Sequence, residues 1–143
     1  MIKTFRGKLA DGGQDTILLH TNTGSIGYRI KKFQVMPTTD NDIESTMKIY
    51  KIKQSSITSD IDFSDNTLLG AAFYTQEGSA QGYPEDMTVI FDNEIFNQDI
   101  YVTLKGHNYT APLNYYIELE QMKLDINENT VATLKDIRNI TAA

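Results

Sequence analysis

Short runs in which apolar and polar residues alternate restrict the fold of this 143-residue chain more than any other feature. Residues 100–104 and 115–119 carry apolar side chains at every second position, and residues 57–63 do so except at Ser59. A period of two is typical of β-strands that bury one face. Clusters of Gly, Asn, Asp and Pro separate the runs at short intervals. Many short strands at such spacing predict a mainly β protein, an antiparallel β-sandwich or jelly roll.

The alternation changes parity at three places, and each change predicts a β-bulge or a bend. We expect these irregularities near Lys31-Lys32, near Tyr50 and near Gln121. Residues 68–74 are continuously apolar, which predicts a central strand covered on both faces. Residues 76–85 form the longest expected loop and should lie on the surface, because Tyr83 is their single core candidate.

The C-terminal segment has a different period. Asn127 can cap a helix over roughly residues 128–139, and apolar residues follow at a spacing of three. They are Val131, Leu134 and Ile137. A helix of this length is marginal alone, so its apolar stripe must pack against the chain's own sandwich or against a neighbouring subunit.

Length and composition limit the classes of function. A chain of 143 residues predicts one domain over residues 1–143, with residues 1–9 as an N-terminal arm or edge strand and residues 127–140 as a C-terminal helix. The absence of cysteine excludes disulfides and thiolate chemistry. The net charge of −6 argues against nucleic acid as a partner. No apolar run approaches the roughly 18 residues of a membrane helix, so no membrane partner is expected.

The search for catalytic or metal-binding patterns yields little. His20 and His107 are far apart and lack the spacing of metal ligands. Residues 60–65 resemble the start of a calcium loop, but Asp65 and Ala71 stand where that loop requires Gly and Glu. We therefore expect no catalytic residue, no cofactor and no metal. A glycosidase-type carboxylate pair is an alternative with candidates by residue type only. These are Asp92, Glu94, Glu118 and Glu120.

Tyrosine is the residue type that most suggests a binding function. The chain has eight tyrosines and no tryptophan, and tyrosine offers contact area with a polar tip. Tyr83 and Tyr109 stand in expected loops, and Lys3 and Arg6 make the N-terminal segment basic. The candidate contact residues are Tyr83, Tyr109, Lys3, Arg6, Val131, Leu134 and Ile137.

The later two-thirds of the chain resembles small β-rich structural proteins of tailed, marine-type bacteriophage particles. The resemblance lies in residues 47–53, 68–74, 89–102, 114–124 and 127–140. It implies a non-catalytic virion structural protein of the capsid decoration or cement type, or a minor capsid protein. Its partners would be the major capsid protein or other virion proteins.

By the same resemblance, the protein would be a homo-oligomer located in the virion after assembly in the host cytoplasm. The basic segment around Lys3 and Arg6 would suit an acidic capsid surface. The alternative function is a glycan- or receptor-binding module of a phage fibre or knob, with Tyr83 and Tyr109 at the contact surface.

Overall fold

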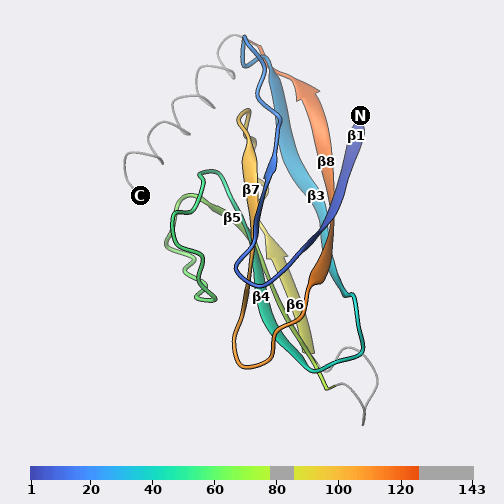
Figure 1. The fold of residues 1–143 in the computed structure, drawn as a ribbon. Helices are drawn as coiled ribbons and strands as arrows, with labels where there is room; N and C mark the ends of the chain where they lie inside the picture. Colours follow the sequence, from blue (N-terminus) through green and yellow to red (C-terminus); the bar gives the residue numbers. More distant parts are fainter. Residues whose placement is uncertain (78–85, 126–143) are drawn as a thin grey trace.

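The computed structural model describes residues 1–77 and 86–125, and within them eight strands form two antiparallel sheets. The sheets pack face to face in a sandwich-like arrangement (Figure 1). The strands are β1 (Ile2–Leu9), β2 (Gln14–Ile17), β3 (Ile26–Pro37), β4 (Ile43–Tyr50), β5 (Leu68–Gln76), β6 (Asp86–Phe91), β7 (Ile100–Gly106) and β8 (Leu113–Lys123). The expectation of a mainly β fold is therefore confirmed, whereas residues 127–140, where a helix was expected, lie outside the described residues.

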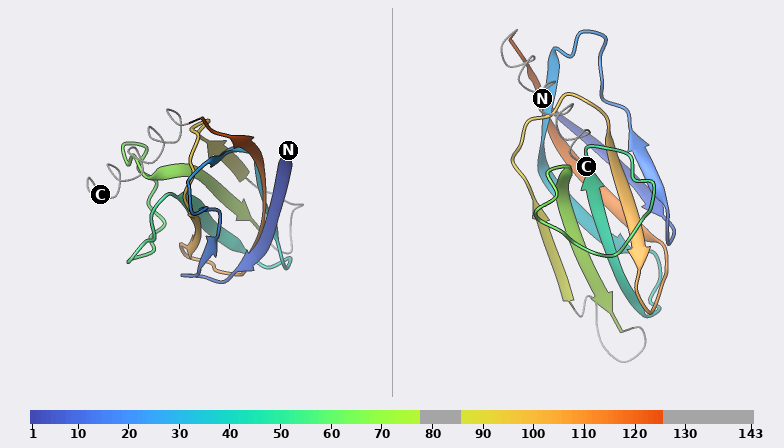
Figure 2. Two further views of the ribbon diagram at one scale, coloured as in Figure 1. Left: turned by 90° about the horizontal axis from the view of Figure 1, so that it is seen from above. Right: turned by 90° about the vertical axis from the view of Figure 1, so that its left-hand side faces the viewer.

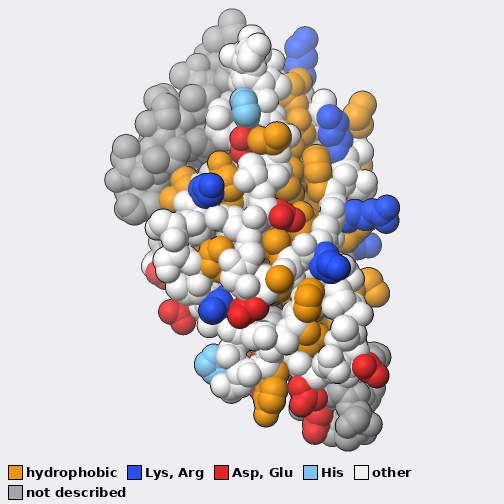
Figure 3. All heavy atoms as spheres, in the orientation of Figure 1, with side chains coloured by type: hydrophobic (Ala, Val, Ile, Leu, Met, Phe, Trp, Pro, Cys, Tyr) orange, Lys and Arg blue, Asp and Glu red, His pale blue; other side chains and the backbone are white. Residues whose placement is uncertain are grey.

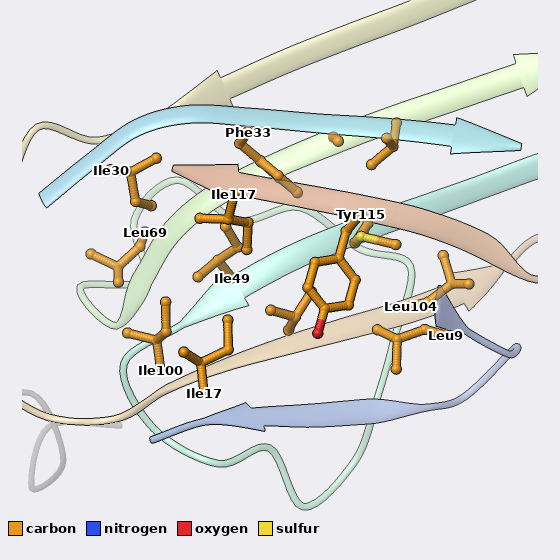
Figure 4. Packing of buried hydrophobic residues seen from close by; sticks show 14 of the residues in the cluster. Leu9, Ile17, Ile30, Phe33, Ile49, Leu69, Ile100, Leu104, Tyr115 and Ile117 are labelled. Atoms are coloured by element: carbon orange, nitrogen blue, oxygen red, sulfur yellow. The ribbon is translucent and has the colours of Figure 1, made fainter. Parts of the chain in front are cut away.

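The three-stranded sheet has the order β1-β8-β3, and the five-stranded sheet has the order β2-β7-β4-β5-β6. Alternate residues of both sheets form one core, in which Phe33 and Ile117 of the small sheet face Ile49 and Ile100 of the large one (Figure 4). All four side chains are fully buried. The period-two runs at 100–104 and 115–119 are thus strands whose apolar faces close the two sheets together.

Two of the three expected irregularities are present. The register between β3 and β8 shifts between Ile30 and Lys32, which leaves Lys31 as the extra residue of a bulge. The register between β4 and β5 shifts between Ile49 and Tyr50. The expectation near Gln121 is wrong, because the β3–β8 register runs on without a shift to Lys123. The parity changes there because β8 ends and Leu124 is buried beyond its end.

The strand expected at residues 57–63 is also wrong, because residues 51–67 form a long loop without strand pairing. This loop crosses the outer face of the five-stranded sheet (Figure 2). The buried Lys48 Nζ donates to the Asp60 carbonyl oxygen at 2.6 Å and to Thr58 Oγ1 at 3.3 Å. Burial lowers the pKa of Lys48, and the charge of Asp60 partly opposes that shift. Polar contacts thus hold the loop, while Phe63 stays 69% exposed.

Residues 68–74 form the first part of β5, which lies between β4 and β6. Most of these side chains are buried, as expected for a strand covered on both faces, but Phe73 is 37% exposed on the outer face. The surface loop expected at 76–85 begins at buried Gln76, the last residue of β5, and residues 78–85 lie outside the described part of the chain.

Candidate interaction surface

The outer face of the three-stranded sheet gathers basic side chains from two strands that are distant in sequence. The register aligns Arg6 of β1 with Tyr116 of β8, and Tyr116 with Gln34 of β3. Because β1 and β3 both flank β8, their outward residues share one surface. We call this surface the basic face. It comprises Arg6, Lys8, Arg29, Lys31 and Lys32.

The centre of the basic face carries the acidic residues of β8, which hold some of these cations. Arg29 forms an ion pair with Glu120, with 2.7 Å between Nη2 and Oε1. The Tyr116 hydroxyl donates to Glu118 Oε2 at 2.8 Å, and Lys32 Nζ lies 5.9 Å from the centroid of the Tyr116 ring. The hydrogen bond to Glu118 raises the pKa of Tyr116. These contacts hold the outward side chains at the centre of the three-stranded sheet in place.

The outer cations of the basic face are available for a partner. Arg6, Lys8 and Lys31 are exposed, and none of them has a carboxylate within ion-pair distance among the described residues. Lys3 is exposed too, but it lies opposite Leu119 and so has the parity of the inward residues. The basic N-terminal residues therefore divide between two sides of β1.

Charge is strongly segregated between the strands of the three-stranded sheet and the rest of the chain. The three strands of the small sheet contain seven Lys and Arg residues and two Glu, which gives +5. The rest of the chain contains six Lys and Arg residues and 17 Asp and Glu, which gives −11. In Figure 3 several Lys and Arg side chains lie along the side occupied by β1, β8 and β3 in Figure 1. A net charge of −6 conceals this arrangement.

The candidate contact residues that the structure describes do not form one site. Arg6 is on the basic face, whereas Tyr109 is 52% exposed in the loop between β7 and β8, at the end of the molecule away from the N-terminus (Figure 1). Lys3 lies on the other side of β1, and the other four candidates lie outside the described residues. They are Tyr83, Val131, Leu134 and Ile137. Sequence reasoning proposed Lys3 and Arg6 as contacts but missed that β8 brings Arg6 onto one face with Arg29, Lys31 and Lys32, because strand pairing across more than 80 residues leaves no local pattern.

The carboxylates considered for catalysis lie in two separate places. Glu118 and Glu120 are on the outer face of β8, whereas Asp92 and Glu94 follow β6 and line a pocket of about 370 Å³. There both Glu94 oxygens accept hydrogen bonds from Lys51 Nζ at 3.0 Å, and Asp92 accepts one from the Glu94 backbone N–H. These carboxylates are thus engaged in structural contacts.

The histidines are also separate. His20 Nδ1 lies 2.7 Å from Asp99 Oδ1, which also accepts from the backbone N–H groups of Leu19 and His20. Burial alone would raise the pKa of Asp99, but these hydrogen bonds outweigh it and lower that pKa. His107 is in the β7–β8 loop. Among the described residues, no three His, Asp or Glu side chains are grouped to hold a metal ion.

Comparison with known proteins gives no family. No family model matches the sequence, and no curated protein matches it. A solved chain from work entitled "Bacillus endospore appendages form a novel family of disulfide-linked pili" aligns with 87% of this chain and 89% of its own length. The identity is 10% and the TM-score is 0.31, so the likeness supports no argument about function. The described part of the chain contains no helix long and apolar enough to cross a membrane.

Proposed function

We propose that this protein is a non-catalytic structural protein of a bacteriophage particle, which binds the shell as a decoration or minor capsid protein. The observation that carries the proposal is the basic face on an otherwise acidic molecule. An exposed sheet face with outward Arg and Lys side chains suits a broad acidic protein surface, since complementary charge steers docking and fixes orientation. A deep substrate site would need a different shape.

The strand order supports a jelly-roll assignment, the architecture of many viral capsid domains. In a jelly roll the eight strands pair as nested partners, first with last, second with seventh, third with sixth and fourth with fifth. Here β1 pairs with β8, β2 with β7 and β4 with β5. The remaining pair is represented by two backbone hydrogen bonds between Tyr28 of β3 and Phe96, which follows β6.

The charge distribution also favours a protein shell over nucleic acid. The five cations of the basic face surround the carboxylates of Glu118 and Glu120. Phosphate backbones would be repelled by carboxylates in the middle of the contact surface, whereas a protein surface can place its own Lys or Arg side chains opposite them.

The test is co-sedimentation of the purified protein with phage particles that lack it, at several salt concentrations. The variant Arg6→Glu/Lys8→Glu reverses two exposed cations of the basic face and should weaken binding at least ~10-fold, because like charges across an interface cost several kcal/mol. Binding of the unmodified protein should weaken as salt rises.

The charge control is Lys53→Glu/Lys105→Glu, which changes the net charge equally away from the basic face and also removes the 3.9 Å ion pair between Lys105 and Asp11. It should bind as the unmodified protein does. Equal weakening by both variants would show that net charge alone matters, and would remove the basic face as the contact surface. Absence of the chain from purified particles by mass spectrometry would remove the virion proposal itself.

A further inference from the structure

Four strands lie at the edges of the two sheets, and three of them carry features that prevent pairing with another chain. Exposed edges are normally protected by charge, bulges, proline or short length. β1 presents Arg6 and Lys8, and β3 has the bulge at Lys31 and ends at Pro37. β2 is four residues long. These three edges are therefore protected.

β6 has none of these features over residues 87–91. Its side chains there are Met, Thr, Val, Ile and Phe, without a charge or a proline. Met87 is 39% exposed, Ile90 is 50% exposed and Phe91 is 38% exposed. Such an exposed apolar edge is a template for strand addition.

The backbone of β6 can accept another strand. Asp92 N–H donates to the Leu69 carbonyl oxygen at 2.7 Å, so Asp92 and Leu69 form a hydrogen-bonded pair of the antiparallel ladder. Such pairs alternate along a ladder. The N–H and C=O groups of Met87, Val89 and Phe91 therefore point away from β5, toward the free edge.

We propose that β6 pairs antiparallel with β6 of a second copy of this chain, which joins two five-stranded sheets into one sheet of ten strands. A groove of about 1100 Å³ follows β3 and the residues after it and reaches β6 at Met87, and Lys32 and Asp40 are among the residues that line it. Lys32 is on β3 and Asp40 lies beyond its end. A two-fold axis reverses the direction of each strand. The end of the groove that carries Lys32 in one copy is therefore directed toward the end that carries Asp40 in the other copy, and these opposite charges favour a second copy as the partner.

The registers of this pairing differ in which strand positions lie opposite each other. With Val89 opposite Val89 of the second copy, Asp86 would lie opposite Asp92. With Thr88 on the two-fold axis, Asp86 lies opposite Ile90, and Met87 exchanges hydrogen bonds with Val89. The proposed dimer therefore has Thr88 on the two-fold axis rather than Val89. This inference concerns the β6 edge, which shares only Lys32 with the basic face, and it does not depend on the proposed function.

The first experiment is disulfide trapping, which is clean because the chain has no cysteine of its own. Two residues opposite each other in a non-hydrogen-bonded pair have Cα atoms about 4.5 Å apart, within disulfide range. Thr88→Cys should give a covalent dimer under mild oxidation. Thr4→Cys is the matched control, since Thr4 is an exposed threonine on the edge strand β1, and it should stay monomeric.

The second experiment removes an outward N–H group without breaking the β5–β6 ladder. Val89→Pro should raise the dissociation constant of the dimer at least ~10-fold in sedimentation velocity, because proline cannot donate. Val89→Thr keeps the N–H and should dimerise as before. Circular dichroism checks that both variants fold. A monomeric unmodified protein at ~100 μM, or equal trapping at Thr88→Cys and Thr4→Cys, would overturn the proposal.

Discussion

Tyr115 is the residue through which the contact between the two sheets can be measured most directly. Its ring crosses the core from β8 (Figure 4), and its hydroxyl donates to Asp15 Oδ2 of β2 at 2.8 Å. Tyr115→Phe removes that hydrogen bond and leaves a partly buried carboxylate without this donor. A hydrogen bond to a charged group contributes about 1.5–3 kcal/mol. At roughly 4 °C per kcal/mol for a domain of this size, the melting temperature should fall by roughly 6–12 °C.

The same contact predicts how the loss depends on pH. Burial and then the hydrogen bond to Asp15 raise the pKa of Tyr115 well above its ordinary value of 10.0. Unfolded Tyr115 loses its proton above about pH 10, whereas folded Tyr115 keeps it. The stability contribution is therefore complete below about pH 10 and declines above it. The difference in stability between the unmodified protein and Tyr115→Phe should shrink in the same range.

The assay is thermal and urea unfolding between pH 7 and pH 11, with Tyr109→Phe as the control. Tyr109 is 52% exposed and its hydroxyl has no hydrogen bond among the described residues. Tyr109→Phe should therefore change the free energy of unfolding by no more than about 0.5 kcal/mol. A double-mutant cycle with Asp15→Asn isolates the pairwise energy. Equal stability of Tyr115→Phe and the unmodified protein at pH 7 would refute the reasoning.

Three further perturbations test other contacts. Gly7→Ala should destabilise the protein by about 1–3 kcal/mol in urea unfolding, because a Cβ there would lie 2.7 Å from the Tyr115 hydroxyl oxygen; Tyr115→Leu should relieve most of that loss. The lowered pKa of Asp99 contributes stability above about pH 4 that is lost as pH falls. In Asp99→Asn the melting temperature should therefore decrease less steeply between pH 7 and pH 2 than in the unmodified protein, as a series of thermal melts would measure. Glu94→Gln should lower the free energy of unfolding by about 2–3 kcal/mol, because it leaves the charge of Lys51, whose side chain is only 3% exposed, without its partner. The double variant Lys51→Met/Glu94→Leu should recover part of that free energy, as measured by urea unfolding.

The strands were predictable where their pattern is local. The runs at 100–104 and 115–119 alternate because one face is buried, and the bulges near Lys31 and Tyr50 appear in the sequence as shifts of that alternation. Residues 57–63 show the same alternation and form no strand. The difference is non-local, because Lys48 supplies hydrogen bonds that hold these residues as a loop over the sheet.

The candidate site was less predictable than the fold. The sequence shows Arg6 and Lys8 in one run and Arg29, Lys31 and Lys32 in another, but only the β1-β8-β3 order places them on one face. That order depends on pairing β1 with a strand more than 100 residues later. The edge position of β6 is likewise a property of sheet order. Its apolar run at 87–91 is visible in the sequence, yet it reads equally as a strand covered on both sides.

The two proposals together predict bivalent binding. Pairing through β6 would place both three-stranded sheets on the same side of the joined sheet, so both basic faces would point in the same direction. Two linked contacts on one lattice raise the overall affinity by ~10²–10⁴ without a new contact. Val89→Pro, which does not touch the basic face, should therefore weaken binding to particles by a factor of this order, whereas Val89→Thr should not. A Val89→Pro monomer that binds as tightly as the unmodified protein would show that one basic face suffices, and would separate dimerisation from docking.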